Sequence, residues 1–225
     1  MAKHIGLIGG IGPAATDFYY RRLIAAYAGR EPGLELTMAH ADTSTLLRHL
    51  GNGDVAGQVA VYSRLTDRLV AAGAECVVVT SIAGHFCIGA FEEVSPLPVI
   101  NMITAVGRAV EARGLRRLGI LGTRTAMLSR FYGGIPTAEI VVPVGQDLDD
   151  VHEAYVAMAS AGVVTVEQRG VFERASERLV REEGVEAILL GGTDLALAFE
   201  EGSAGFPVID CVGMHVAEIV RFAGG

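Results

Sequence analysis

The sequence Gly6-Leu7-Ile8-Gly9, followed by Phe18-Tyr19, recurs 113 residues later as Gly119-Ile120-Leu121-Gly122, followed by Phe131-Tyr132. Two further matches pair residues 73–79 with 184–190 and residues 98–101 with 207–210. Three matches in the same order indicate one duplicated unit rather than chance similarity.

The duplication identifies two equivalent positions at which the copies differ in chemistry. Thr80-Ser81 in the first copy corresponds to Gly191-Gly192 in the second, and each pair follows an apolar stretch typical of a buried strand. Because open α/β sheets bind ligands at the carboxyl ends of their strands, these positions are the first candidates for a functional site.

The composition argues against several classes of partner. The chain has 225 residues, of which 51% are hydrophobic, enough for two domains of about 100 residues each. The net charge is −8 and no basic stripe is present, so we expect neither a nucleic-acid nor a membrane partner. Without a signal peptide or membrane-spanning run, a cytoplasmic protein is expected. The three cysteines lack metal-ligand spacing, which predicts no metal site and fits a reducing compartment.

Short apolar runs alternate with longer helical stretches along the chain. We expect strands at residues 5–8, 34–39, 76–80, 99–101, 117–121, 138–142, 187–190 and 208–210. We expect helices at residues 14–27, 56–72, 103–113, 125–133, 149–159, 171–183 and 214–222. This alternation predicts an α/β fold of two pseudosymmetric three-layer domains with mostly parallel sheets. The first domain should comprise residues 1–102 with 208–225, and the second residues 103–207.

The glycine-rich segment Gly9-Gly10-Ile11-Gly12-Pro13 joins a predicted strand to a predicted helix. Glycines there let backbone N–H groups approach an anion, which makes Gly10 a candidate contact for a substrate carboxylate. The dinucleotide pattern Gly-x-Gly-x-x-Gly fails because Ala15 takes the place of its third glycine. We therefore expect no nucleotide cofactor, and a tight turn without a ligand remains an equal alternative.

These motifs resemble those of the aspartate/glutamate racemase family. Residues 8–16 resemble its opening glycine motif, and residues 189–195 resemble its Leu-Gly-Cys-Thr-Glu-Leu motif. Residues 80–85 lie where the family has Pro-Cys-Asn-Thr-Ala-His. Residues 207–210 and His215 resemble its closing strand and helix.

The resemblance implies a ligand cleft between the two domains, no cofactor and a homodimer. It also implies an isomerase in which one cysteine from each domain exchanges a proton with the substrate's α-carbon. This chain has Ser81 and Gly192 at those two positions. A serine hydroxyl needs an activating base to do such chemistry, and glycine has no side chain to exchange a proton.

Other side chains near these positions are candidates for proton transfer or substrate binding. His85 follows Ser81 by one helical turn and is either an activator of its hydroxyl or a structural histidine. Asp194 stands at the family's Glu position and is either a base or a helix cap. We therefore predict catalytic roles for Ser81, His85 and Asp194. The expected substrate contacts are Gly10, Asp42, Thr80, Thr123, Gly192 and Thr193, with helix capping as the alternative for Asp42.

Three functions are compatible with this pattern. The first is a cofactor-independent racemase or epimerase that acts on a small amino acid or carboxylate with a rebuilt acid–base pair. The second is a lyase such as a decarboxylase, which needs only one proton donor. The third is a non-catalytic protein that binds a small carboxylate. The resemblance favours the first.

Overall fold

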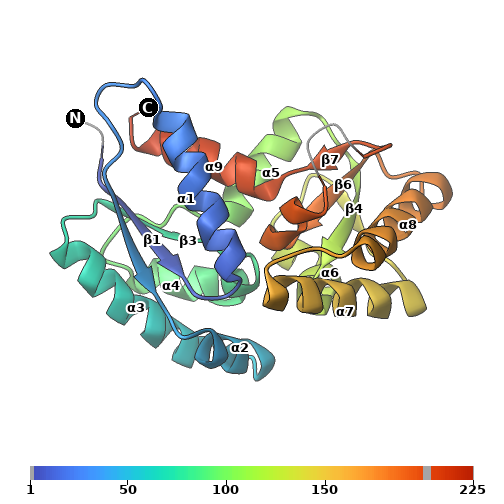
Figure 1. Ribbon diagram of the computed structural model, residues 1–225, viewed down its shortest axis with the longest axis horizontal. Coiled ribbons are helices and arrows are strands. Elements are labelled where there is room, and N and C mark those ends of the chain that lie inside the picture. The colour runs from blue at the N-terminus through green and yellow to red at the C-terminus, as the bar shows by residue number, and fades with distance from the viewer. Residues whose placement is uncertain (1–2, 200–203, 225) are drawn as a thin grey trace. The chain divides into compact units, whose positions relative to one another are not determined.

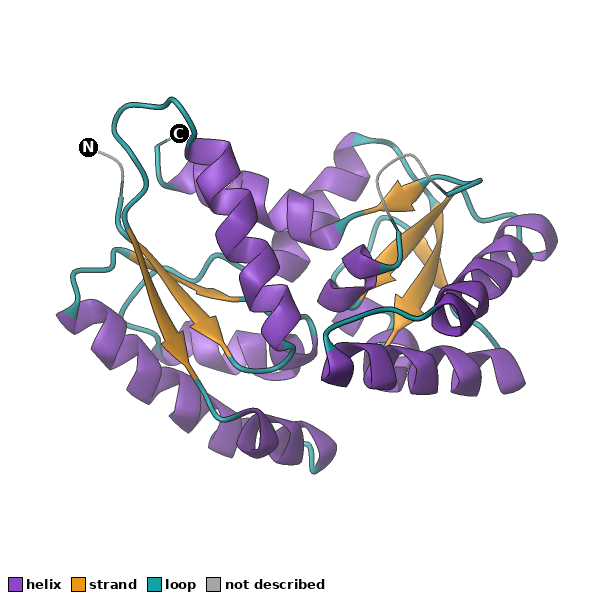
Figure 2. Ribbon diagram, viewed as in Figure 1, coloured by secondary structure: helices purple, strands orange, loops and turns teal. Residues whose placement is uncertain are grey.

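The computed structural model describes residues 3–199 and 204–224, and the chain divides into two compact units. The first unit contains Met1–Asn101 and His215–Gly225, and the second contains Met102–Met214. Figure 1 labels the elements, and Figure 2 shows strands surrounded by helices in each unit. All strand pairs are parallel, which confirms the α/β fold with parallel sheets.

The first unit has a three-stranded sheet in the order β2-β1-β3. Its elements are β1 (Ile5–Gly9), α1 (Pro13–Tyr27), β2 (Leu36–His40), α2 (Thr43–Gly51), α3 (Val55–Ala71), β3 (Cys76–Val79), the 3-10 helix η1 (Ala83–Cys87), α4 (Ile88–Val94) and the greater part of α9 (Cys211–Phe222). Every residue of β1 and β3 is buried, as expected for strands covered on both faces.

The second unit has a four-stranded sheet in the order β5-β4-β6-β7. Its elements are α5 (Met102–Ala112), β4 (Arg117–Gly122), α6 (Arg124–Leu128), η2 (Phe131–Gly133), β5 (Glu139–Val141), α7 (Gln146–Ala161), α8 (Val166–Glu182), β6 (Ala187–Gly191), η3 (Thr193–Leu197) and β7 (Val208–Ile209). The order β5-β4-β6 in the second unit repeats the order β2-β1-β3 in the first. The duplication seen in the sequence is therefore also a duplication of topology.

The structure differs from the sequence prediction in several places, and it adds the unexpected helices α2, η1, α4 and η3. Strand β7 pairs with β6, so the chain returns to the first unit at His215 and not at residue 208. The expected strand 99–101 contributes only a single bridge, between Val77 and Val99. The expected helix 125–133 is divided into α6 and η2, because residues 130–132 have φ values of 51°, 57° and 56°, which no right-handed helix accommodates.

The central strands of the two units pack against their crossover helices through equivalent glycines. A Cβ at Gly6 would lie 2.9 Å from the carbonyl oxygen of Cys76 and 3.0 Å from Leu69 of α3. A Cβ at Gly119 would lie 2.7 Å from Ile188 and 3.0 Å from Leu179 of α8. Glycine at both positions therefore allows a helix to approach the central strand closely.

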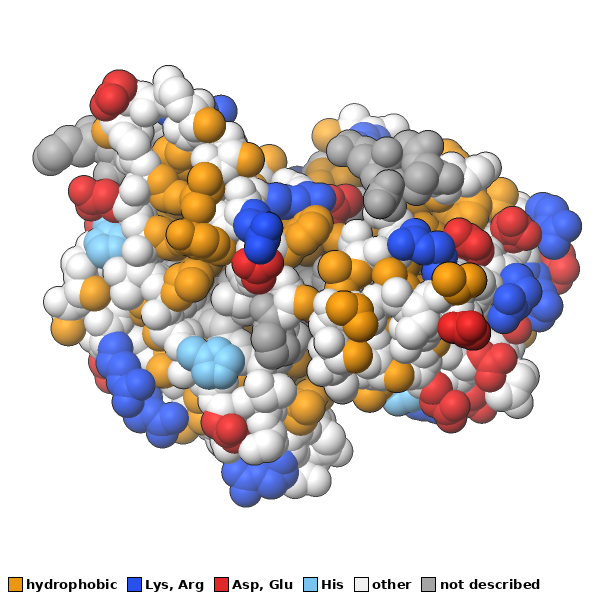
Figure 3. Space-filling model, in the orientation of Figure 1, with side chains coloured by type: hydrophobic (Ala, Val, Ile, Leu, Met, Phe, Trp, Pro, Cys, Tyr) orange, Lys and Arg blue, Asp and Glu red, His pale blue; other side chains and the backbone are white. Residues whose placement is uncertain are grey.

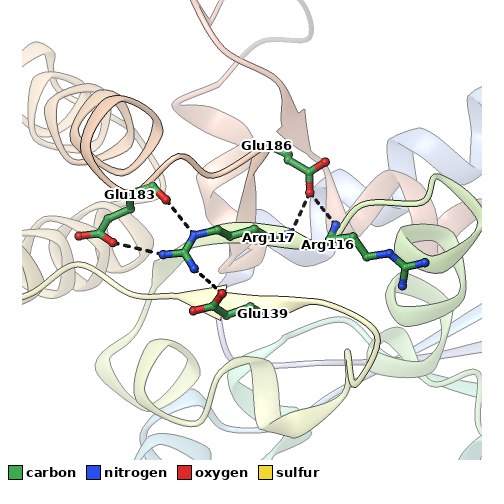
Figure 4. A network of polar contacts seen from close by, with 5 residues as sticks. All are labelled: Arg116, Arg117, Glu139, Glu183 and Glu186. Carbon is green, nitrogen blue, oxygen red and sulfur yellow. Dashed lines mark hydrogen bonds and ion pairs between the residues drawn. The ribbon is translucent and has the colours of Figure 1, made fainter.

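In each unit a glutamate carboxylate also binds the backbone at the amino end of the central strand. The carboxylate of Glu75 accepts the backbone N–H of His4 at 2.9 Å, and that of Glu186 accepts the N–H groups of Arg116 and Arg117 at 2.6 and 2.8 Å. In the second unit the Arg117 guanidinium also reaches Glu183 and Glu139 (Figure 4). These contacts lie at the strand ends opposite the candidate site, and we assign them to stability.

Some large apolar side chains remain at the surface. Tyr20 and Ile24 lie one turn apart on α1, exposed by 42% and 47%, and apolar atoms are visible over that helix (Figure 3). Scattered exposed apolar groups are normal on folded proteins, so this pair alone indicates no partner. Among the residues that the structure describes, no helix is both long enough and apolar enough to cross a bilayer.

The glycine contacts predict unequal costs of adding a methyl group. Gly6→Ala should lower the free energy of unfolding by about 1–3 kcal/mol, because the new Cβ meets a strand carbonyl that cannot move alone. Gly119→Ala should cost less, because its neighbours are the flexible ends of side chains. Urea unfolding measures both. Gly33→Ala, which meets no atom within 4 Å, should stay within about 0.5 kcal/mol of the wild type. Equal stability of all three variants would contradict this packing.

Candidate functional site

Thr80, directly after β3, joins the loops at the carboxyl end of the first sheet. Its hydroxyl donates to the carbonyl of Ile8 at 3.2 Å, and it lies 3.0 Å from the Thr16 hydroxyl of α1. Because Thr80 uses its own proton on a carbonyl, Thr16 is the donor of the second bond. Thr80 is fully buried and Ser81 beside it is 5% exposed, so Thr80 holds the segment that carries Ser81.

His85 contacts Ser81 as its spacing predicted, but through the backbone. The Nδ1 atom donates to the carbonyl oxygen of Ser81 at 2.7 Å, and this bond positions the backbone without drawing a proton from the hydroxyl. Burial lowers the pKa of His85 to about 4, so the ring is neutral at pH 7.

A second buried histidine completes the core of the first unit. His215 of α9 lies edge-on to His85, with ring centroids 6.2 Å apart. Its Nε2 donates to the carbonyl of Ile100 at 2.7 Å, which leaves Nδ1 to accept from the Tyr19 hydroxyl at 2.6 Å. Burial, and next the nearby His85, lower the pKa of His215 to about 3. These bonds give His215 a structural role in the core of the first unit.

In the second unit, the space beside Gly192 is filled by Tyr155 of α7. A Cβ at Gly192 would overlap Cε2 of the tyrosine ring and would lie 2.5 Å from Cζ and 2.8 Å from the hydroxyl oxygen. No side chain fits at position 192 while this ring keeps its place. The phenol end of Tyr155 therefore stands at the carboxyl end of β6.

Asp194 and Thr193 lie on the same side of this end of the sheet as Tyr155. The Tyr155 hydroxyl donates to Oδ2 of Asp194 at 3.1 Å, and Thr193 Oγ1 lies 3.5 Å from the same oxygen. All three residues are buried. Burial, and next the charge of Asp194, raise the pKa of Tyr155 well above 10, so the phenol keeps its proton at neutral pH.

The remaining predicted contacts lie in the loops after β1, β2 and β4. A Cβ at Gly10 would lie 2.6 Å from Leu46 and 2.7 Å from the Ala41 carbonyl, so glycine is needed there for packing. Asp42 caps α2 by accepting the N–H of Thr45 at 2.8 Å, and bonds from Ser44 and Thr45 lower its pKa to about 2. Thr123 caps α6 in the same way.

The three cysteines are buried, and none directly follows β3 or β6. Cys76 lies within β3, Cys87 ends η1 and Cys211 begins α9. Burial raises the pKa of Cys76 to about 11 and of Cys87 to about 12, and that of Cys211 rises well above 9. None is a thiolate at neutral pH. No group of three His, Cys, Asp or Glu side chains able to hold a metal occurs in residues 3–199 and 204–224.

The structure adds residues that the sequence analysis did not single out. Thr16 and Tyr19 of α1 bond to Thr80 and His215, and Tyr155 of α7 bonds to Asp194. In the sequence of α7, Tyr155 stands in line with Val151 and Met158, a spacing typical of the buried side of a helix. That pattern indicates a core residue and gives no sign of a functional one. Only the glycine at position 192 was a signal that a bulky neighbour occupies this space.

Comparisons with known proteins agree with this fold. A sequence model described as Asp/Glu/Hydantoin racemase matches residues 8–219. A structure of a candidate Asp/Glu racemase from Yersinia pestis is 26% identical, with a TM-score of 0.84, covering 98% of this chain and 99% of that one. An aspartate racemase homologue from Pyrococcus horikoshii is 24% identical, with a TM-score of 0.83, covering 99% and 100%. A liganded double mutant of arylmalonate decarboxylase is 19% identical, with a TM-score of 0.57, covering 99% and 93%.

The two buried histidines predict a loss of stability in acid. Their folded pKa values, about 4 and about 3, lie below the 6.5 of an unfolded histidine, so below pH 6.5 the unfolded chain binds more protons than the folded one. Stability is unaffected by these groups above pH 6.5 and falls as the pH drops toward 4. Between pH 7 and pH 5 the free energy of unfolding should decrease by about 4 kcal/mol, measured by urea unfolding.

Two matched variants test whether the buried histidines cause that loss of stability. In His85→Asn the amide replaces Nδ1 as donor to Ser81 without a titrating group, so roughly half of the loss between pH 7 and pH 5 should disappear. His40→Asn removes an exposed histidine and should leave the loss unchanged. An unaltered pH dependence in His85→Asn would show that His85 does not titrate in this way.

Proposed function

Because the chain belongs to the Asp/Glu/hydantoin racemase family, we propose that it is a cofactor-independent isomerase acting on a small amino acid or carboxylate. The reaction would be a racemisation or epimerisation by proton transfer at the α-carbon. One observation carries the proposal: equivalent strands of the duplicated units, β3 and β6, both end in buried groups able to move protons. These are Ser81 in the first unit and the bonded pair of Tyr155 and Asp194 in the second.

The chemistry requires groups that are protonated and held in place. A Cα–H bond is a very weak acid, so the negative charge that develops must meet prearranged donors rather than water. Oxygen acids are the groups present at the two strand ends, since the buried thiols lie elsewhere and keep raised pKa values. In this proposal Ser81 acts in the first unit as a proton donor, a role that needs no activating base, with His85 and Thr80 as its positioning residues.

The substrate contacts follow from the loops at the same strand ends. Thr123, Thr193 and the backbone at Gly192 are the carboxylate contacts proposed for the second unit, and the backbone at Gly10 is the contact proposed for the first. Asp42, which stays ionised at neutral pH because of its lowered pKa, is suited to an ammonium group. An amino acid carries both groups, which favours it over a plain carboxylate.

A decarboxylase is the second candidate, and the geometry at Gly192 favours it. Glycine leaves no side chain of its own at the end of β6, and a decarboxylation needs only one proton donor after carbon dioxide leaves. The chain also shares its fold with arylmalonate decarboxylase. The two candidates differ in product, so one set of substrates distinguishes them.

Solvent deuterium tests the proposal. The protein is incubated in D2O with each enantiomer of aspartate and glutamate, and with phenylmalonate. Incorporation of deuterium at the α-carbon with inversion supports the isomerase, and release of carbon dioxide from phenylmalonate supports the decarboxylase. Neither signal at high protein concentration would reject both enzyme functions and leave a carboxylate-binding protein, detected as a ligand-dependent rise in Tm.

The role of Ser81 predicts a specific loss. Ser81→Ala should reduce the rate of deuterium incorporation by about 10²–10⁴-fold, because it removes a proton-transfer group while leaving the backbone bond from His85 in place. Mass spectrometry of the recovered substrate gives the rate. Ser160→Ala, an exposed change on α7, should leave the rate unaltered. A rate in Ser81→Ala equal to that of the wild type would remove Ser81 from the mechanism.

A further inference from the structure

Tyr155 occupies the space that a side chain at position 192 would use. The atoms that a Cβ would meet are Cε2, Cζ and the hydroxyl oxygen, the last at 2.8 Å, so the phenol end of the ring lies there rather than its base. A side chain growing from position 192 would thus place its functional atom close to where the Tyr155 hydroxyl already stands. The oxygen acid at the end of β6 comes from α7 instead of from the strand.

We propose that the Tyr155 hydroxyl is the proton donor of the second unit and takes the place of an acid at position 192. This inference rests on the proposed function and assigns the second proton-transfer step of that reaction to one atom. Asp194 then acts through Tyr155, as the positioning residue that holds the phenol by its bond to Oδ2.

In this proposal the Tyr155 hydroxyl breaks its hydrogen bond to Asp194 when it donates to a substrate. The distance from the Tyr155 hydroxyl to Oδ2 is 3.1 Å, longer than the usual 2.7–2.8 Å of a bond between a hydroxyl and an oxygen. Rotation about the Cζ–O bond would turn the proton from Asp194 to a substrate. Thr193 already donates its hydroxyl proton to the same oxygen at 3.5 Å, so Asp194 keeps this hydrogen bond when the Tyr155 proton turns away.

The proton balance of the step is simple. The α-carbon carries an electron pair after carbon dioxide has left it. That pair takes the Tyr155 proton, so a C–H bond forms, the O–H bond breaks and a phenolate remains beside the Asp194 carboxylate. Because two neighbouring negative charges are unfavourable in a buried place, the phenolate recovers a proton from solvent, or from the substrate in the reverse direction.

The variant Tyr155→Phe tests the donor directly. It keeps the ring beside Gly192 and removes the hydroxyl alone. With the substrate of the set above that exchanges fastest in the wild type, kcat for deuterium incorporation should fall about 10²–10⁴-fold while KM changes less than about threefold. Tyr20→Phe, at an exposed position of α1, is the matched control and should equal the wild type.

Two outcomes of this experiment separate the inference from the proposed function. If Tyr155→Phe retains the wild-type rate, Tyr155 is not the donor, and the isomerase or decarboxylase stands with another acid. If the wild type itself exchanges nothing with any of these substrates, the proposed function fails and the donor role fails with it. Loss of exchange in Tyr155→Phe with an unchanged urea midpoint supports the inference, because a merely structural role would lower the midpoint.

A second measurement tests the place of Tyr155 without relying on activity. Gly192→Cys should lower the urea midpoint by about 1 M or more, because the buried ring must move to admit the new side chain. Adding Tyr155→Ala should restore much of that shift and make the new thiol reactive toward Ellman's reagent. A Gly192→Cys protein as stable as the wild type would show that Tyr155 does not fill this space, and would overturn the inference.

Discussion

The space beside Gly192, directly after β6, admits either a side chain at position 192 or the ring of Tyr155 from α7, but not both. Tyr155 in turn bonds Asp194, and Asp194 lies within reach of Thr193. The polar arrangement at this end of the second sheet thus follows from one steric exclusion. Glycine at position 192 is therefore required by the packing of Tyr155, and the phenol that we propose as the acid comes from α7.

The duplication explains what the two units share, and their loops explain how they differ. Both sheets use a glycine in the central strand to admit a crossover helix, and both use a glutamate before the third strand to bind the start of the first. These devices lie within the strands or at their amino ends. At the carboxyl end of its sheet the first unit has Ser81, whose carbonyl is bonded by His85, and His85 in turn contacts His215. At the equivalent place the second unit has the Tyr155 phenol bonded to the Asp194 carboxylate.

Much of the fold was predictable because its signals are local. Buried parallel strands appear as continuous apolar runs, and the repeated motifs indicate two units of the same topology. The path of residues 208–214 was not predictable, because a two-residue strand such as β7 is defined by its partner β6 rather than by its own sequence. In the site, the spacing of Ser81 and His85 predicted their contact but not that a carbonyl would accept the bond. Tyr155 was missed because it lies in an apolar row of α7, and only the three-dimensional structure shows which residue fills the space left by a glycine.

In the mechanism that we propose, Tyr155 presents its hydroxyl to the carbon beside a substrate carboxylate. A crystal structure of the protein with malonate bound tests this placement, since malonate has two carboxylates on one carbon. We expect the tyrosine ring against Gly192, with its hydroxyl oxygen about 3–3.5 Å from the central carbon of malonate. A ring turned away from Gly192, or malonate bound out of reach of Tyr155, would contradict it.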